Sequence, residues 1–245
     1  MKKFDQLIYG ARAVIETIQS GKHLEKLFIQ KNNTSDLVKQ LLTLTSEHVI
    51  PVSWVPGEKL NRLTKGNHQG VVAFVSPVQY HNLHHVVTNV FEEGKTPLFL
   101  ALDGVTDIRN FGAIARTAEC MGVDALIIPV KSNAQINADA VKTSAGALNY
   151  IPVCRDLKLL EALKYLKDSG IQVVACSEHG TISPAEVDFS VPTVIVMGSE
   201  EEGITREILK ISDAISSIPM KGEISSLNVG SAAAMILYEA TRQRI

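Results

Sequence analysis

Two polar side chains near the middle of the sequence have the chemistry of a binding or catalytic site. Asn110 stands at the start of an expected helix, and Arg116 follows six residues later, about one and two-thirds helical turns away. An amide can cap a helix or hold a ligand, and a guanidinium can bind an anion. At this spacing the two side chains need not share a face. The local sequence therefore favours a helix cap for Asn110 and a surface charge for Arg116.

Two further segments combine glycine with polar side chains. MGSEEEGI at residues 197–204 places three glutamates between two glycines, which permit a sharp turn and a close approach to a ligand. Consecutive carboxylates do not converge on one Mg²⁺ ion, so an exposed acidic turn is an equally good interpretation. IPMKGEISSLNVGSAAAMILYEA at residues 218–240 holds three candidate caps for a helix of small residues, which are Ser225, Ser226 and Asn228.

The sequence gives little support for nucleotide-binding, disulfide or metal sites of the well-known kinds. Neither a GxGxxG fingerprint after a strand nor a GxxxxGK[ST] loop occurs, so a nucleotide site of those kinds is not indicated. The three cysteines form no CxxC pair and no disulfide framework, which favours a reducing compartment. His81, His84 and His85 would share one side of a helix, as a metal site requires, but no cysteine or carboxylate accompanies them locally. Solvated histidines are the favoured interpretation, and no metal site is predicted.

The elements that must position these segments alternate between strands and helices from Pro97 onward. Apolar strands without polar alternation, separated by helices, are typical of an α/β fold with a parallel sheet covered on both faces. Ligands in such sheets bind at the carboxyl ends of strands, here the loops after Asp103, Met197 and Ile218. The expected strands are 98–102, 125–130, 173–176 and 193–197, and the expected helices are 111–121, capped by Asn110, 156–167 and 232–242.

The first part of the chain has its own pattern. Periodicity predicts helices at 11–18 and 35–44 and strands at 24–29 and 71–75, which together make a small α/β unit. A polar stretch between Pro77 and Pro97 is interpreted as a linker with a short helix. The predicted organisation is a small domain at 1–76, a linker at 77–96 and a larger domain at 97–245.

Composition and charge narrow the class of protein. The 245 residues are 45% hydrophobic and carry 24 basic against 26 acidic side chains, which excludes a disordered chain and a uniformly basic nucleic-acid coat. Residues 1–76 carry net +4 and residues 77–245 carry net −6, from ten basic and six acidic against fourteen basic and twenty acidic side chains. This asymmetry indicates a polyanion contact by the first part, or two ordinary solvated surfaces. Neither a signal peptide nor a membrane-spanning stretch is recognised, so a soluble cytoplasmic protein is expected.

Taken together, the three polar segments carry a specific resemblance. NFGAIAR, MGSEEEG and IPMKGEISSLNVGSAAA, in this order, resemble the three successive motifs of the SpoU (TrmH) family of RNA ribose 2'-O-methyltransferases, part of the SPOUT superfamily. YGARAVIE and NHQGVVAFV near the N-terminus resemble the substrate-binding extension of family members of the RlmB type. Together these stretches span nearly the whole chain.

The resemblance implies more than the pattern alone could. It implies a parallel-sheet SPOUT methyltransferase domain with a trefoil knot, preceded by a small α/β RNA-binding domain. It further implies S-adenosylmethionine as the methyl donor and a homodimer whose active sites lie beside the subunit interface. The RlmB-like extension favours a guanosine of 23S ribosomal RNA as the target. A transfer RNA target is one alternative, and a non-catalytic RNA-binding ribosome-assembly factor is another.

Ten residues match the family's site positions. The resemblance implies that Arg116 serves as the base for the ribose hydroxyl or, since a guanidinium stays protonated, binds a phosphate and stabilises the developing alkoxide. It implies that Asn110 and Glu200 orient Arg116, and that Ser226 and Asn228 support cofactor and RNA. The residues expected to line the cofactor pocket are Met197, Gly198, Ile218, Met220 and Leu227, with Gly198 admitting the ligand against the backbone and apolar side chains enclosing the adenine.

Candidate contacts for RNA lie in the basic first part. Aromatic residues make up only 5% of the chain, so recognition of RNA shape and backbone is expected rather than extensive base stacking. The candidates for phosphate contact are Arg12, Lys22, His23, Lys26, Lys31, Arg62, Lys65 and His68.

Overall fold

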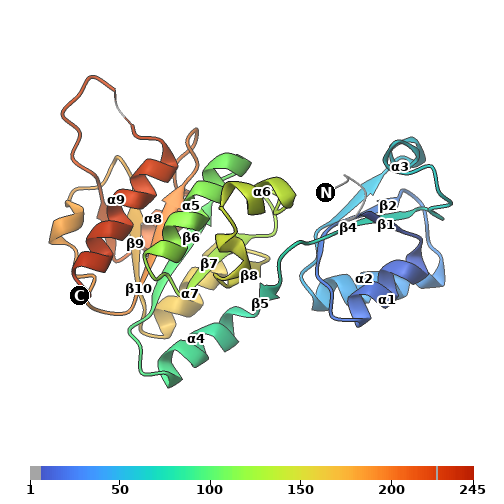
Figure 1. Ribbon diagram of the computed structural model, residues 1–245, viewed down its shortest axis with the longest axis horizontal. Coiled ribbons are helices and arrows are strands. Elements are labelled where there is room, and N and C mark those ends of the chain that lie inside the picture. Colours follow the sequence, from blue (N-terminus) through green and yellow to red (C-terminus); the bar gives the residue numbers. More distant parts are fainter. Residues whose placement is uncertain (1–6, 225) are drawn as a thin grey trace. The chain divides into compact units, whose positions relative to one another are not determined.

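The computed structural model describes residues 7–224 and 226–245, which fall into two compact units with the boundary between Gln79 and Tyr80 (Figure 1). The smaller unit has a four-stranded mixed sheet in the order β1-β4-β2-β3. Its elements are β1 (Leu7–Tyr9), α1 (Ala11–Gln19), β2 (Leu24–Gln30), α2 (Asp36–Glu47), β3 (Val52–Val55), α3 (Gly57–Leu63) and β4 (Val71–Val75).

The two faces of the smaller sheet are packed differently. Side chains alternate along each strand, so Leu27 and Ile29 of β2 face the apolar stripes of α1 and α2. Phe28, between them, faces the opposite side, where Leu60 of the short helix α3 packs against it. The helices predicted at 11–18 and 35–44 and the strands at 24–29 and 71–75 are therefore present, each within a few residues of its expected bounds.

One turn of this unit holds a valine in a strained conformation. Val49 has φ +52°, and the bonds from Ile50 N–H to the Thr45 oxygen and from Val49 N–H to the Ser46 oxygen form a Schellman motif after α2. A β-branched residue is unfavourable there, so we expect Val49→Asn to raise the free energy of unfolding by about 1 kcal/mol. Urea unfolding measures this change, and a lower unfolding free energy would contradict it.

The larger unit has a seven-stranded sheet, parallel throughout, in the order β11-β9-β10-β6-β7-β8-β5. The α/β fold with a parallel sheet is thus confirmed. The elements are β5 (Tyr80–His81), α4 (Leu83–Glu92), β6 (Leu98–Asp103), α5 (Ile108–Cys120), β7 (Ala125–Pro129), α6 (Ala138–Thr143), η1 (Ala147–Asn149), β8 (Val153–Asp156), α7 (Leu159–Asp168), β9 (Gln172–Cys176), η2 (Pro184–Glu186), β10 (Thr193–Gly198), α8 (Arg206–Ile211), β11 (Ala214–Ser216) and α9 (Val229–Arg242).

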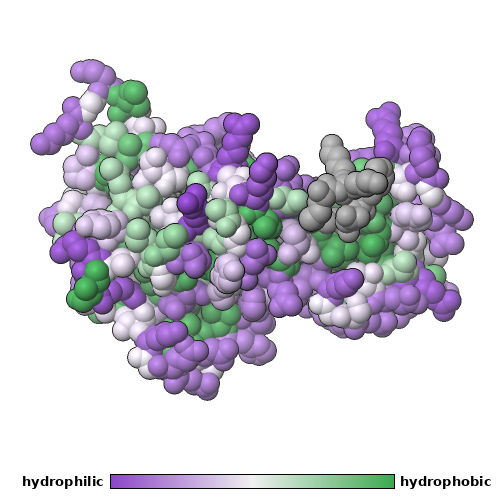
Figure 2. Space-filling view, in the orientation of Figure 1, coloured by the Kyte–Doolittle hydropathy of each residue, from purple (hydrophilic) through white to green (hydrophobic). Residues whose placement is uncertain are grey.

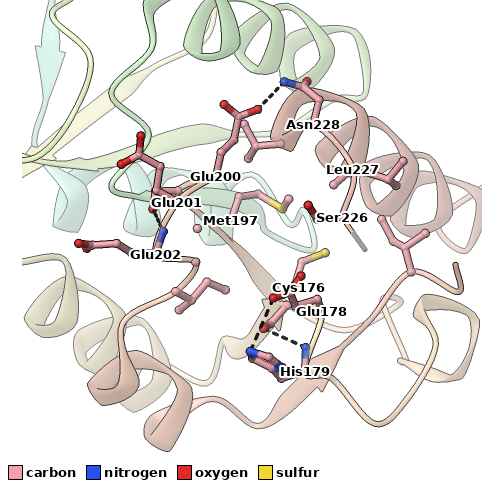
Figure 3. A pocket seen from close by; sticks show the side chains of 18 of the residues that line it. Cys176, Glu178, His179, Met197, Glu200, Glu201, Glu202, Ser226, Leu227 and Asn228 are labelled. Carbon is pink, nitrogen blue, oxygen red and sulfur yellow. Dashed lines mark hydrogen bonds and ion pairs between the residues drawn. The ribbon is translucent and has the colours of Figure 1, made fainter. Parts of the chain in front are cut away.

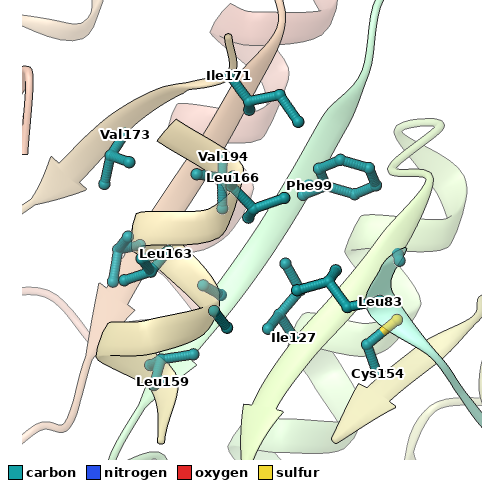
Figure 4. Close-up of a cluster of buried hydrophobic side chains, with 14 of the residues drawn as sticks. Leu83, Phe99, Ile127, Cys154, Leu159, Leu163, Leu166, Ile171, Val173 and Val194 are labelled. Atoms are coloured by element: carbon teal, nitrogen blue, oxygen red, sulfur yellow. The ribbon is translucent and has the colours of Figure 1, made fainter. Parts of the chain in front are cut away.

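Helices cover both faces of this sheet. On one face α4, α7 and α8 pack on alternate strand residues such as Phe99, Ile127 and Val194, all fully buried (Figure 4). On the other face α5 and α9 lie side by side (Figure 1), and the Thr241 hydroxyl at the end of α9 donates to the Met121 carbonyl after α5. The two central strands β6 and β10 are therefore buried on both sides, which explains their unbroken apolar sequences.

The stretch at residues 77–96, predicted as a linker with a short helix, contains that helix as α4, and its residues from Tyr80 onward belong to the larger unit. Tyr80 and His81 form β5, which pairs with β8 at the edge of the larger sheet. The helix α4 that follows buries Leu83 and Val87 in the core of the larger unit. His84 lies against the Tyr165 ring, with the two ring centroids 3.9 Å apart. The sequence pattern did not predict β5, because a two-residue strand becomes recognisable only beside its partner.

Two predicted helix starts are also corrected. Asp107, not Asn110, caps α5: its side chain accepts from the backbone N–H groups of Arg109 and Asn110, so the helix begins three residues earlier than predicted. The helix predicted at 156–167 begins only at Leu159, because residues 153–156 pair with β7 as strand β8.

A close crossing of two distant segments lies at one end of the larger sheet. Ser177 N–H donates to the Ser216 oxygen, and Ser217 N–H donates to the Ile182 oxygen, both at 2.9 Å. The loop after β9 thus packs directly on the chain after β11. The trefoil knot itself stays a prediction. Among the described residues, helices long and apolar enough to cross a membrane are absent.

Candidate active site

A cavity of about 720 Å³ opens at the carboxyl ends of three neighbouring strands, β11, β9 and β10 (Figure 3). Its walls come mainly from the ends of these strands and the segments that follow them, with lining residues within 176–179, 197–204, 218–220 and 226–232, and from Leu209 of α8. Strand ends of a parallel sheet meet at one edge, which explains how segments far apart in sequence form a single pocket. The loops after Met197 and Ile218 are among those predicted, whereas the loop after Asp103 does not line the cavity.

The side chains expected to hold a cofactor are brought together here. Met197 and Gly198 come from the end of β10, and Ile218, Met220 and Leu227 come from the segment before α9. All five line the cavity. Glu200, Ser226 and Asn228, three of the expected polar residues, line it as well. Ser225 lies outside the described residues.

Asn228 joins three of the polar segments through one amide group. Its Oδ1 atom accepts from the N–H groups of Gly230 and Ser231 and so caps α9. Its Nδ2 atom donates to Oδ1 of Asn110 at 3.0 Å and to Oε1 of Glu200 at 2.6 Å. Asn110 is therefore no plain helix cap. The amide fixes the starts of α5 and α9 and the acidic loop relative to one another.

Arg116 lies apart from this network. A helix turns by 100° per residue, so the side chains of Asn110 and Arg116 point about 120° apart around α5. Arg116 is exposed and is not part of the cavity wall. Among residues 7–224 and 226–245 it forms neither a hydrogen bond nor an ion pair, so the expected orientation of Arg116 by Asn110 and Glu200 is not seen within one chain.

A glycine is needed at position 198 for a different structural reason from the one predicted. A Cβ atom at this position would lie 2.3 Å from the carbonyl carbon of Gly203, so backbone rather than ligand fills the space beside it. Ser199 and Gly203 exchange two backbone hydrogen bonds of 3.1 Å, which close the acidic loop into a tight turn. Gly198 is thus needed to shape the cavity wall. Gly180 is similar, since its Cβ atom would lie 2.4 Å from the carbonyl carbon of Ser216.

The sequence did not indicate the wall contributed by residues 176–179. These residues directly follow a correctly predicted strand, and that position was the available signal. Burial raises the pKa of the Cys176 thiol to about 11, so the pocket presents a neutral thiol rather than a nucleophilic thiolate.

Glu178 adds a fourth carboxylate to the three of the acidic loop, and the residues of the cavity wall include neither lysine nor arginine. In the described part of the chain, metal-binding groups of three or more His, Cys, Asp or Glu residues are absent.

The basic residues of the smaller unit do not form one cluster. Arg12 lies in the first turn of α1 and Lys22 lies beyond its other end, so the length of the helix separates them. Lys26 lies on β2, on the side of the sheet that α3 covers, and Arg62 and Lys65 lie at the end of α3 and just after it.

His68 is a weaker phosphate ligand than the sequence suggested. Its Nδ1 atom accepts from Gly70 N–H at 2.9 Å, and its Nε2 atom lies 2.9 Å from Oδ1 of Asn61. Both ring nitrogens are therefore used in holding the loop before β4.

Known protein families match both units. Residues 97–238 match the SpoU rRNA Methylase family, and residues 7–81 match the model described as RNA 2'-O ribose methyltransferase substrate binding. A protein from Bacillus subtilis (strain 168), named putative TrmH family tRNA/rRNA methyltransferase YacO, is 33% identical over 244 residues, which are 100% of this chain and 98% of the relative. A protein of the same family name from Staphylococcus saprophyticus is 35% identical over 97% of this chain and 96% of its own length.

Solved structures agree with these matches. The SpoU methyltransferase AviRb from Streptomyces viridochromogenes, crystallised with AdoMet, matches with a TM-score of 0.62 and 26% identity over 97% of this chain and 90% of its own. The TrmH/SpoU tRNA modifying enzyme from A. aeolicus matches with a TM-score of 0.56 and 33% identity, over 66% of this chain and 84% of its own. By sequence over its full length and by fold, this chain belongs to the SpoU (TrmH) family of RNA ribose 2'-O-methyltransferases.

Proposed function

We propose that this protein transfers a methyl group from S-adenosylmethionine to the ribose 2'-hydroxyl of a guanosine in 23S ribosomal RNA. The observation that carries the proposal is the amide of Asn228, which links Asn110 and Glu200 at the mouth of a cavity lined by all five residues expected for the cofactor. Family membership supplies the reaction class. The cofactor, the target RNA and the residue roles are the proposal.

The cavity suits this cofactor in size and chemistry. Its volume lies within the range of about 300–1,000 Å³ that is typical of small-molecule sites. Ile218, Met197 and Leu227 offer an apolar wall for an adenine ring, while the glutamates favour a cationic ligand. When bound, S-adenosylmethionine would supply an electrophilic methyl group on a sulfonium centre. A titration of the protein with S-adenosylmethionine, followed by calorimetry, tests binding without requiring turnover.

The polar residues would act on the RNA side of the reaction. The attacking 2'-hydroxyl would give its proton to water or to a neighbouring RNA phosphate as the new C–O bond forms, and the methyl–sulfur bond of the donor would break to leave S-adenosylhomocysteine. Arg116 would bind a neighbouring phosphate and stabilise the developing alkoxide, since its guanidinium stays protonated and makes charge-assisted hydrogen bonds. Asn228 and Glu200 would hold the loops that place the hydroxyl in line with the methyl group, and such positioning is worth about 7–11 kcal/mol in favourable cases.

A ribosomal target is favoured by how much of the chain the neighbours share. An rRNA methyltransferase from Sinorhizobium meliloti matches over 98% of this chain, with 25% identity and a TM-score of 0.63. The A. aeolicus tRNA modifying enzyme matches over only 66%. The curated relatives are named for both RNAs, so a transfer RNA is the second candidate.

The target is tested by methyl transfer from tritiated S-adenosylmethionine to total RNA of a strain that lacks this gene, separated by size. Label in large-subunit ribosomal RNA supports the proposal. Label in transfer RNA keeps the chemistry and replaces the substrate. The absence of label from every fraction, ribosome-assembly intermediates included, would indicate a non-catalytic RNA-binding factor.

The Asn228 amide offers a test of the polar network alone. In Asn228→Asp the Oδ1 cap of α9 is retained, but an acceptor replaces the donor that faces Asn110 and Glu200. We expect turnover to fall about a hundredfold, with the thermal midpoint within a few degrees of wild type. Asn228→Ala, which removes the cap as well, should lower the midpoint further. Near-normal turnover in Asn228→Asp would contradict the role given to the network.

We also propose a homodimer in which Arg116 serves the cavity of the other subunit. Two observations support it: Arg116 is exposed and does not line its own cavity, and α9 exposes Met235 and Tyr238, one turn apart. Figure 2 shows pale green and white atoms, with purple ones among them, where Figure 1 places α5 and α9.

Mixing two inactive variants tests this arrangement. When Arg116→Ala and Asn228→Asp chains are unfolded and refolded together in equal amounts, half of the dimers contain both chains. Each mixed dimer then holds one site with both residues intact, so roughly a quarter of wild-type activity should return. A mixture as inactive as its components would show that each subunit uses its own Arg116 or that the chains do not associate.

A further inference from the structure

Two lysines of the smaller unit converge on one aromatic ring. The Nζ atom of Lys26, on β2, lies 5.2 Å from the centroid of the Phe28 ring, and the Nζ atom of Lys59, on α3, lies 5.0 Å from the same centroid. The sum of those distances, 10.2 Å, is the upper limit for the separation of the two ammonium groups. The geometry therefore holds two positive charges within 10.2 Å of each other, beside one ring.

The local structure explains why they meet. Lys26 and Phe28 are two residues apart on β2 and so face the same side of the sheet. Leu60 of α3 is fully buried on that side, which brings the preceding Lys59 over the ring. Phe74 of β4 pairs in register with Lys26, and its ring meets Phe28 edge to face with centroids 6.2 Å apart.

The positive charges of Lys26 and Lys59 are not neutralised by ion pairs among the described residues. In the described part of the chain, neither lysine forms an ion pair with a carboxylate, whereas Lys39 and Lys164 are each paired with one. Arg62 follows Lys59 by three residues on α3 and so lies on the same side of that helix. Three cations within one short helix and its facing strand favour an anion that offers several charges in a row.

We propose that this lysine face, defined as Lys26, Lys59 and Arg62, binds successive phosphates of the substrate RNA backbone. The inference rests on the proposed function for its RNA substrate and goes beyond it by selecting one surface among the scattered basic residues. Contacts of this kind fix the position of an RNA without reading its sequence. Arg12 and Lys22, at opposite ends of α1, are not part of the lysine face.

The test compares two double variants of the full-length protein that remove the same charge. Lys26→Gln with Lys59→Gln changes the lysine face, and Lys39→Gln with Lys164→Gln changes paired lysines elsewhere. Binding to a fluorescent fragment of the RNA that the wild-type protein methylates is followed by anisotropy at several salt concentrations. We expect the first variant to bind about tenfold more weakly and its salt dependence to fall by about one to two phosphate contacts. The control variant should bind as wild type does.

Further measurements distinguish a loss of RNA binding from a loss of folding or of cofactor binding. Cofactor affinity and thermal midpoint should stay unchanged, and Lys26→Arg with Lys59→Arg should restore RNA binding. Wild-type RNA affinity and salt dependence in the glutamine variant would overturn the inference while the proposed function stands. If the wild-type protein methylates no RNA, the proposed function itself fails. Equal losses of RNA affinity in both double variants would show that only net charge matters, and would contradict the assignment of RNA binding to the lysine face.

Discussion

Replacing Arg116 by alanine is expected to lower the rate of methyl transfer by about 10²–10³-fold and to leave cofactor affinity within about twofold of wild type. The separation follows from where the side chain lies. Arg116 is exposed on α5 and is not part of the cavity wall, so the cofactor site should stay intact without it. The lost guanidinium would otherwise stabilise charge on the RNA during the transfer. Single-turnover kinetics with saturating cofactor and calorimetric titration measure the two quantities.

Arg109→Ala is the matched control for this variant. Arg109 is exposed on the same helix seven residues earlier and therefore on the same face, two turns away. Its replacement removes the same charge and should leave turnover within a few-fold of wild type. Joint loss of cofactor binding and turnover in Arg116→Ala would contradict the role assigned to this residue.

Replacing Gly198 by alanine is expected to have the largest effect on the cavity. The added Cβ atom would lie 2.3 Å from the carbonyl carbon of Gly203, a contact that backbone cannot relieve without opening the Ser199–Gly203 turn. We expect cofactor affinity to fall by a hundredfold or more, about 3 kcal/mol. Overpacking of this kind should also lower the free energy of unfolding by about 1–3 kcal/mol. Calorimetry and urea unfolding measure the two changes.

Gly170→Ala is a control that introduces backbone strain without changing the cofactor site. Gly170 has φ +81°, but an added Cβ atom there would meet nothing within 4 Å. Its replacement should cost about 1 kcal/mol of stability through left-handed strain and leave cofactor affinity unchanged. If Gly198→Ala bound the cofactor as tightly as Gly170→Ala, the turn would not shape the cofactor site.

The sequence predicted best the elements whose pattern is both long and periodic. The strand expected at 193–197 is observed as Thr193–Gly198, and the helix expected at 11–18 as Ala11–Gln19. Short elements escaped prediction because their stability comes from partners. The two residues of β5 and the three of β11 carry too little pattern to be distinguished from loop, and each is fixed by a neighbouring strand.

The sequence predicted which residues belong to the candidate site better than it predicted how they are arranged. The family motifs pointed to Glu200 and Asn228, but not to the bond between them, which joins residues 28 positions apart. Local preference assigned Asn110 as a cap, whereas Asp107 takes that position and leaves the Asn110 side chain free to bond with Asn228. Gly180 was missed because only the crossing with Ser216, 36 residues later, excludes a side chain there.

The central claim is that the methyl group is placed on a ribose 2'-oxygen, and alkaline digestion of the labelled RNA tests it most directly. Alkaline cleavage requires a free 2'-hydroxyl, so a 2'-O-methylated nucleotide survives joined to its neighbour. The protein should therefore place tritium in an alkali-resistant dinucleotide that begins with guanosine. Release of the label as a single nucleotide would mean that the methyl group sits on a base, and would contradict the account.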